Sequence, residues 1–384
     1  MKRIILVSML ALMISIGLTL PENCMTASAE EMKYPAQIRA STATMLSGTT
    51  IMMMAVAPQF EEIIGSKLRA VPSDLLASQC LAMKKGKADF WNVHLASSYR
   101  AVFGVEEYAT PRWGPQKIRI AWKGGPTFLA MGVRANSGIK TIQDLKGKKV
   151  GVYAGSEGFI SAYLAFGDLT LEDVKVIPAT GFGGALTQLS ENRIDSALTS
   201  VATPVAYEMD ESPSGLYYIP LPRKDKAGWK RLQRIYPALL PYTVPQNIGT
   251  KSGWGVEMAG FPKGNFLYAD QKDVIAYAIA KVYAEGYDEY QDKHSHLPYW
   301  TKEAALDCLD VPTPYHTGSI KYFKEKGWWT PEHEKWQQNQ VRLENMRQEA
   351  WVKALAEAKT KNIETEIDNK EWQDLWRGYI NKME

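Results

Sequence analysis

One local pattern occurs in two separate stretches of the sequence: a short apolar run ends in small polar residues, which lead into a helix-forming segment. The first stretch covers residues 37–98 and the second covers residues 148–204. The first contains three such strand–loop–helix repeats, and the second contains two, followed by a third strand with its loop. Strands that alternate with helices form parallel sheets whose two faces are covered by those helices. The sequence therefore predicts an α/β protein with two Rossmann-like lobes.

Two extended stretches, residues 118–134 and 255–268, lie after the first block and after the second. A pair of strands that leave one lobe and re-enter it would form a two-stranded hinge. We therefore expect lobe one to comprise residues 36–125 plus 268–328, and lobe two to comprise residues 126–267.

The C-terminal segment, residues 329–384, is predicted to be a helical extension. Thr330-Pro331-Glu332 is typical of a helix start, with proline in the first turn. Apolar side chains then recur on one face of each of two helices. We expect these faces to pack on lobe one, and the alternative is a docking surface for a partner.

The N-terminus is predicted to be a secretory signal peptide, residues 1–29. Lys2 and Arg3 precede an apolar run over residues 4–20, and Ala27-Ser28-Ala29 provides a cleavage site. The alternative is a membrane anchor. We expect the mature chain to be periplasmic. Of its cysteines, Cys80 and Cys308 either pair or remain separate thiols, and we favour separate thiols.

Charge and motif content exclude several functional classes. The chain has 45 basic and 42 acidic residues, and no long run of one sign, so no nucleic-acid partner is expected. Neither a dinucleotide fingerprint nor a phosphate loop is present, and no cofactor is expected. No serine lies in a nucleophile elbow. His294 and His296 are spaced like a metal pair, but we interpret them as solvated histidines and expect no metal site.

Ligands of open parallel sheets bind outside the carboxyl ends of the strands. The polar loops at these ends lead into helices, whose free N–H groups favour an anion. An ordinary capping role is the alternative for each serine and threonine. An arginine clamp is also considered, from Arg39, Arg100, Arg112, Arg119 or Arg134. The predicted ligand-binding residues are Thr44, Ser47, Thr49, Ser73, His94, Trp122, Ser156, Gly158, Phe182 and Ser200.

Three stretches carry a resemblance to a known family. Residues 136–154 read NSGIKTIQDLKGKKVGVYA, residues 180–199 read TGFGGALTQLSENRIDSALT, and residues 312–327 read PTPYHTGSIKYFKEKG. On these blocks, and on Ser47-Gly48-Thr49, the chain resembles the TAXI family of TRAP-transporter solute-binding proteins. The likeness covers residues 36–328. The first loop departs from the family pattern, with methionines where glycine and tyrosine are usual.

The resemblance implies a type II periplasmic-binding-protein fold. It also implies a function, as the solute-binding component of a TRAP (tripartite ATP-independent) transporter. Such a protein captures a small organic anion, a carboxylate or an amino acid, and delivers it to the membrane subunits of the transporter. We expect a monomer and no enzymatic activity. The alternatives are an enzyme that reuses this fold and a ligand sensor for a membrane receptor.

Overall fold

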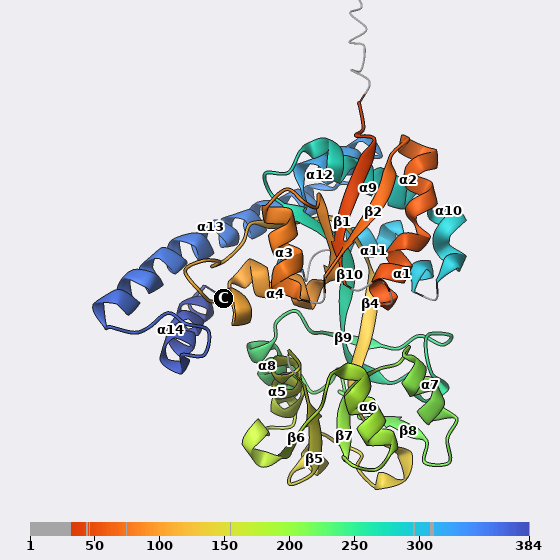
Figure 1. Ribbon diagram of the computed structural model, residues 1–384, viewed down its shortest axis with the longest axis vertical. Helices are drawn as coiled ribbons and strands as arrows, with labels where there is room; N and C mark the ends of the chain where they lie inside the picture. The colour runs from red at the N-terminus through yellow and green to blue at the C-terminus, as the bar shows by residue number, and fades with distance from the viewer. Residues whose placement is uncertain are drawn as a thin grey trace, which may run out of the picture. The chain divides into compact units, whose positions relative to one another are not determined.

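The computed structural model contains two compact units, Met1–Lys33 and Tyr34–Glu384, and the account below concerns the second (Figure 1). The predicted signal peptide, Thr44 and Cys308 lie outside the residues that the structure describes. None of the helices in the described part is long and apolar enough to cross a membrane. The described residues are 32–43, 45, 47–73, 75–153, 155–294, 296–307 and 311–383.

The strands form a mixed sheet in the order β2-β1-β3-β10-β4-β7-β5-β6, with β8 paired to β4 and β9 paired to β10. The two outer groups, β1 to β3 and β5 to β7, are each parallel. The strands are β1 (Gln37–Thr42), β2 (Lys67–Pro72), β3 (Phe90–His94), β4 (Ile118–Arg134), β5 (Lys149–Val152), β6 (Lys175–Pro178), β7 (Ser196–Ser200), β8 (Leu216–Tyr218), β9 (Leu240–Thr243) and β10 (Glu257–Tyr268).

The long strands β4 and β10 are antiparallel to each other and connect the two parallel groups. β3 pairs with residues 263–266 of β10, whereas β7 pairs with residues 129–133 of β4. The sheet is continuous because both long strands run through both halves. The fold is therefore the predicted one, with two α/β lobes joined by a two-stranded hinge.

Helices cover the strands of each lobe, as the alternating pattern predicts (Figure 1). On the side of β1 to β3 lie α1 (Gly48–Ala55), α2 (Ala57–Ile64), α3 (Leu76–Lys84), α4 (Leu95–Phe103), α9 (Asp273–Glu285), α10 (Tyr287–Tyr290), α11 (Lys302–Leu306) and α12 (Thr317–Glu325). On the side of β5 to β7 lie α5 (Glu157–Phe166), α6 (Phe182–Ser190), α7 (Pro204–Asp210) and α8 (Lys226–Ile235).

The C-terminal extension forms a long helix, α13 (Pro331–Thr360), and a shorter one, α14 (Lys370–Asn381). Trp372 donates its indole N–H to the carbonyl of Ala109 at 2.7 Å, and Trp376 donates to the carbonyl of Gly104 at 3.0 Å. The buried Glu344 of α13 forms an ion pair with Arg119 of β4. The extension therefore packs on lobe-one elements.

Candidate functional site

A cavity of about 340 Å³ lies where the two lobes and the hinge meet. Its lining comes from both parallel groups of strands, from the loops that follow them, and from both hinge strands. The lining residues are Thr49, His94, Ser97, Thr127, Leu129, Tyr153, Gly155, Phe159, Phe182, Leu198, Ser200, Ala202, Thr203, Phe261, Lys263, His294 and His296.

The floor of the cavity is one face of the central sheet. The register places Lys263 opposite His94, Phe261 opposite Thr127, and Leu129 opposite Ser200. Directly opposed residues point to the same face, and so do alternate residues along one strand. The pleat of β3, β10, β4 and β7 therefore brings these side chains together although they are far apart in sequence.

The rim of the cavity consists of loops and helix starts at the carboxyl ends of strands. Thr49, Ser97 and Phe182 belong to the first turns of α1, α4 and α6. Tyr153 and Gly155 belong to the loop between β5 and α5. The free N–H groups at helix starts favour an anion. The cavity thus occupies the position that the parallel-sheet rule predicts.

Lys263 is the only lysine or arginine among the described residues that line the cavity, and it is 7% exposed. No aspartate or glutamate of the described part lines the cavity with it. Burial in these surroundings lowers the pKa of Lys263 to about 8. A buried ammonium without a carboxylate partner is costly, and a bound anion would remove that cost.

Three histidines surround this lysine. Burial and the nearby Lys263 charge lower the pKa of His94 well below its usual range and that of His296 to about 3. The same two causes lower the pKa of His294. Uncharged imidazoles can still donate a hydrogen bond to a ligand. The group Lys263, His94, His294 and His296, here called the basic cluster, is therefore suited to a negatively charged ligand.

A pair of glycines allows the segment that carries His294 and His296 to reach the hinge. Gly124 and Gly125 of β4 form a bulge in the ladder beside Lys263. A Cβ on Gly124 would lie 2.3 Å from the ring of Trp300, and one on Gly125 would lie 2.4 Å from Cβ of Tyr299. Residues 297–300 therefore lie directly on β4, and this close approach places the two histidines in the cavity wall.

Aromatic rings form the apolar part of the lining. The rings of Phe261 and His94 are 4.9 Å apart, and those of Phe261 and Phe159 are 5.9 Å apart. Tyr153 and Phe182 form a second, edge-to-face pair at 6.3 Å. Burial raises the pKa of Tyr153 to about 12, so its phenol is uncharged at neutral pH. Both pairs can pack on an apolar portion of a ligand.

Of the predicted ligand-binding residues, Thr49, His94, Phe182 and Ser200 lie in this cavity. Thr44 lies outside the described residues. The remaining five line other parts of the structure. Three of these have local roles in loops and helix starts, as described next, and Gly158 and Trp122 are packed against neighbouring side chains.

Ser47 caps α1, because its hydroxyl accepts from the N–H of Thr50 at 3.2 Å. Ser156 is buried, and its hydroxyl donates to the carbonyl of Tyr153 at 2.8 Å while it accepts from the N–H of the same residue. The carbonyl of Ser73 accepts from the side-chain amide of Gln79. Ser47 is therefore a helix cap, Ser156 closes its own loop through its hydroxyl, and Ser73 contacts Gln79 through its main chain.

Trp122 lies in the core of lobe one rather than at the cavity. Its ring stacks on Tyr283 at 6.4 Å and packs against Phe323 at 5.9 Å. Trp122 is fully buried among these rings and does not line the cavity. Gly158 lies close to Glu106, 2.8 Å from the position of a Cβ, and serves packing between α5 and η1 (Glu106–Tyr108).

The arginines considered as a clamp bind elsewhere. Arg39 pairs with Asp89 at 2.8 Å, and Arg119 pairs with Glu344. Arg134 donates to the carbonyls of Leu189 and Ile194. Arg100 and Arg112 are also absent from the cavity lining. The positive charge comes from a lysine on a hinge strand instead.

Sequence reasoning missed Lys263 and misjudged the histidine pair. His296 is buried and His294 is half-buried in the cavity wall, so the interpretation of both as solvated is wrong. Their position depends on the glycine bulge, which brings a distant segment onto β4. A signal for Lys263 did exist, because it is the one charged residue between Met258 and Tyr268, which is most of β10.

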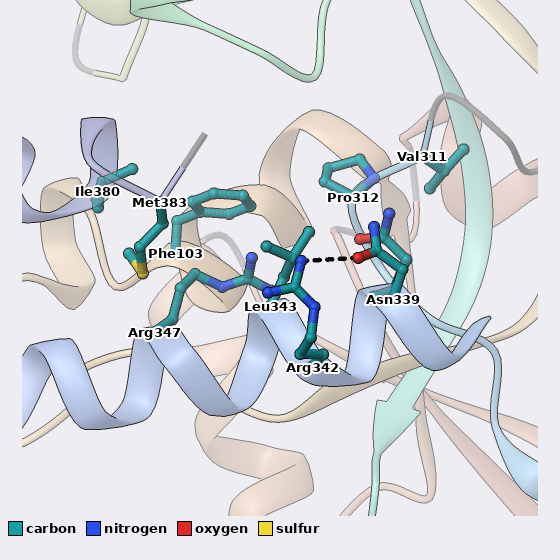
Figure 2. Close-up of a pocket in the computed structure, with 10 residues that line it drawn as sticks. Phe103, Val311, Pro312, Asn339, Arg342, Leu343, Arg347, Ile380 and Met383 are labelled. Atoms are coloured by element: carbon teal, nitrogen blue, oxygen red, sulfur yellow. Dashed lines mark hydrogen bonds between the residues drawn. The ribbon is translucent and has the colours of Figure 1, made fainter. Parts of the chain in front are cut away.

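A second cavity, of about 360 Å³, lies between the C-terminal extension and lobe one (Figure 2). In it Arg342 donates to the side chain of Asn339 at 2.9 Å, and the guanidinium of Arg347 lies 4.3 Å from the ring centre of Phe103. Its lining contains no residue of lobe two. Relative movement of the two lobes therefore does not enclose a ligand there.

No group of histidine, cysteine and acidic side chains in the described part could hold a metal ion.

Sequence comparison decides the family. Residues 77–327, more than half of the 384 residues, match the NMT1-like family. The chain belongs to the NMT1-like family. Among curated proteins, no sequence matches this NMT1-like chain.

Solved structures similar to the NMT1-like protein include periplasmic binding proteins. A sulfonate-binding protein of Methylobacillus flagellatus is 14% identical, with a TM-score of 0.46, over 76% of this chain and 95% of that one. The aliphatic sulphonate-binding protein SsuA of Escherichia coli is 14% identical, with a TM-score of 0.44, over 81% and 87%. An L-cystine receptor of Neisseria gonorrhoeae is 15% identical, with a TM-score of 0.38, over 67% and 91%.

Proposed function

We propose that this protein is an extracytoplasmic solute-binding protein that captures a small organic anion between its two lobes and delivers it to a membrane transporter. The observation that carries the proposal is Lys263, buried in the interlobe cavity without an acidic neighbour in its lining. The site carries one positive charge of its own, and a bound anion would provide the compensating negative charge. A protein that only needed a stable hinge would gain from an apolar residue there.

Capture by closure follows from how the lining is divided. Thr49, His94 and Ser97 belong to the proposed lobe one, whereas Phe182, Ser200 and Thr203 belong to the proposed lobe two. A ligand that contacts both sets favours the form in which they are close together. The hinge strands carry Lys263 and Phe261, so an anion held there lies on the axis between the lobes.

Direct contacts between the lobes support the closed form as well. Arg100 of α4 donates to the carbonyl of Gly155 at 3.0 Å. Tyr236, at the end of α8, donates its hydroxyl to the carbonyl of Ala96 at 2.8 Å and accepts from Arg100 at 3.1 Å. These few polar bonds are weak enough individually to break when the lobes separate.

A TRAP-type permease is the partner that the sequence resemblance favours. The block at residues 312–327 has structural roles in lobe one. His316 caps α12 by accepting from the N–H of Gly318 at 3.1 Å. A Cβ on Gly318 would lie 2.1 Å from the carbonyl oxygen of Asp273, so this glycine allows α12 to lie against α9. The block therefore stabilises the packing of α12 in lobe one. The ligand that binds depends on the cavity lining instead.

We infer a binding role rather than catalysis because the cavity lacks the partners that general-base chemistry uses. No carboxylate of the described part lines the cavity to orient one of the histidines. The pKa values of His94, His294 and His296 are all lowered, so these imidazoles are neutral. The positive charge of the neighbouring Lys263 ammonium opposes their protonation.

Ligand-dependent stabilisation tests the proposal. The mature protein would be heated with succinate, 2-oxoglutarate, L-glutamate, hexanoate and phenylacetate, each in parallel with the Lys263→Met variant. An acid at a hundred times its dissociation constant stabilises the folded state by about 2.7 kcal/mol, which raises the melting temperature by a few degrees. At least one acid should stabilise the native protein and not the variant. If every acid leaves both proteins unchanged, the binding function is wrong.

Delivery to a permease is tested separately. Membrane vesicles from the organism that produces this protein would be mixed with the binding protein and with the acid found above, both added outside the vesicles. Uptake that requires an ion gradient and proceeds without ATP supports a TRAP partner. Uptake that requires ATP assigns an ABC-type permease, and no uptake with either energy source contradicts delivery.

A further inference from the structure

The charges of the cavity lining are unevenly distributed. Lys263 is directly opposite His94 in the β-ladder and lines the same cavity as His294 and His296. The lining residues of the proposed lobe two that lie outside the hinge strands β4 and β10 carry no charge, and are Tyr153, Gly155, Phe159, Phe182, Leu198, Ser200, Ala202 and Thr203. The cavity thus has one cationic part, at the hinge and lobe one, and one uncharged part with aromatic rings.

We propose that the solute is an organic monoanion whose carboxylate lies at the basic cluster and whose apolar body, the size of one aromatic ring with a short linker, lies against Phe159, Phe261 and Phe182. This inference rests on the function proposed above and names the substrate class of the same site. It separates the solute from amino acids and dicarboxylates, which the sequence leaves equally open.

The cavity volume fits a ligand of this size. An apolar cavity of about 150 Å³ is enough to hold benzene. The interlobe cavity, at about 340 Å³, is roughly twice as large. One ring, a linker of two or three carbons and a carboxylate fit within such a space.

An amino acid is disfavoured because nothing in the lining compensates its ammonium group. A carboxylate held by Lys263 places the α-ammonium of an amino acid within the same basic cluster. None of the described lining residues is aspartate or glutamate. Two ammonium groups in one partly buried site repel each other, and the repulsion is strong where water is excluded.

A dicarboxylate is disfavoured because no lysine or arginine of the described residues lines the uncharged part of the cavity, where its second carboxylate would lie. Its second carboxylate would face Leu198, Phe182 and Ala202. Apart from the N–H groups at the start of α6, hydroxyls are the polar groups there, and none of these carries the full positive charge that a buried carboxylate requires. The apolar rings instead favour an uncharged body.

Thr127 provides an independent sign of a ligand. Its hydroxyl is buried in the cavity lining and has no hydrogen-bond partner among the described residues. Native proteins leave few buried polar atoms unpaired, so each one calls for an explanation. Thr127 is opposite Phe261 and lies on the same face as Lys263. Its hydroxyl is therefore positioned to donate to a carboxylate that Lys263 holds.

Four related compounds separate the possibilities by isothermal titration calorimetry. The reference probe is 3-phenylpropionate. L-Phenylalanine adds an ammonium to it, benzylsuccinate adds a second carboxylate, and 3-phenylpropanol removes the charge. We expect 3-phenylpropionate to bind at least 100-fold more tightly than each of the other three. Succinate and L-glutamate, which lack the ring or carry an ammonium, should bind no better than L-phenylalanine.

Variants assign the two parts of the site. Lys263→Met should weaken 3-phenylpropionate binding at least 100-fold, and Thr127→Val should weaken it about fivefold. Phe182→Ala, at a half-buried position, should weaken it about tenfold and leave any binding of succinate unchanged. Lys175→Met removes one exposed charge outside the cavity and should have no effect.

The possible failures are distinguishable. If succinate, benzylsuccinate or L-glutamate binds more tightly than 3-phenylpropionate and requires Lys263, the monoanion class is wrong and the proposed binding function stands. If 3-phenylpropionate binds equally well to Lys263→Met, the assigned orientation is wrong. If no acid binds the native protein, the monoanion class and the proposed function are both wrong.

Discussion

Lys263 of β10 lies directly opposite His94 of β3 in the antiparallel ladder, and both side chains point into the interlobe cavity. The two residues are far apart in sequence, and each is a base with a lowered pKa. The pair joins the hinge to the carboxyl end of a lobe-one strand. A ligand bound here would contact the long strands that connect the two parallel groups of the sheet.

Replacing Lys263 with methionine should stabilise the empty protein. Burial lowers the pKa of Lys263 from 10.5 to about 8, which corresponds to a cost of about 3 kcal/mol for holding the charge in the folded state. Because the folded pKa lies below the unfolded one, the cost is complete below pH 8 and disappears as the pH rises to 10.5. Urea unfolding of Lys263→Met at pH 7 should show the increase, and at pH 10 it should largely vanish. Equal stability of both proteins at pH 7 would contradict the buried charge.

Anion affinity should fall above pH 8. A bound carboxylate requires the protonated ammonium, whose pKa in the empty protein is about 8, so affinity should decrease about tenfold for each further pH unit. The lining histidines stay neutral in this range because their pKa values are lowered, and Tyr153 titrates near 12. Calorimetry with 3-phenylpropionate from pH 7 to 10 measures the slope.

The control for this pH profile is Lys263→Arg, since a guanidinium stays charged over the whole range. Its affinity, whatever its absolute value, should be flat from pH 7 to 10. A flat profile for the native protein would show that another group provides the charge.

Gly124→Ala should lower both stability and affinity. The added methyl group would lie 2.3 Å from the ring of Trp300, and relief of this clash moves the segment that carries His294 and His296. Overpacking of this kind costs about 1–3 kcal/mol. Thermal unfolding and calorimetry measure the two effects together.

Gly183→Ala is the matched control for this substitution. Gly183 lies in α6, and a Cβ there meets nothing within 4 Å. Alanine in a helix is favoured over glycine by about 0.5–1 kcal/mol, so this variant should be slightly more stable and bind normally. If Gly124→Ala and Gly183→Ala have the same stability and the same affinity, the close approach of Trp300 to Gly124 does not hold the two histidines in place.

Tyr236→Phe should shift the protein toward the open form. The hydroxyl bonds to Ala96 and Arg100 across the lobes, and its loss removes about 1 kcal/mol or more from the closed form. Affinity for 3-phenylpropionate should fall about five- to tenfold. Small-angle X-ray scattering of the ligand-free variant should give a larger radius of gyration. An unchanged radius together with unchanged affinity would show that this contact does not control closure.

Trp372→Ala should destabilise lobe one without changing the ligand site. Trp372 is buried, bonds to the carbonyl of Ala109 and packs edge-to-face on Trp351 at 5.2 Å. A large-to-small change at such a site costs about 3–5 kcal/mol. Leu375→Ala, at a half-buried position of the same helix, is the milder comparison. Urea unfolding should show the difference, and calorimetry below the unfolding transition should show normal affinity.

The sequence predicts where the candidate site lies but identifies few of the residues that line it. The rule that ligands bind at the carboxyl ends of parallel strands locates the cavity and finds Thr49, His94, Phe182 and Ser200. The same loops also yield Ser47 and Ser156, whose hydroxyls cap and close their own turns. Local sequence does not separate these roles, because a helix start needs a capping oxygen whether or not a ligand lies beyond it.

The sequence by itself determines the two α/β lobes and the pair of connecting strands, because periodic apolar runs and helix-start residues act over short distances along the chain. Only the tertiary structure decides which side chains meet. Lys263 meets His94 through the register of β10 on β3, and His296 joins them because Gly124 and Gly125 leave room for a segment more than 160 residues away. The charge of the site depends on desolvation, which is a property of the assembled cavity and of no single stretch of sequence.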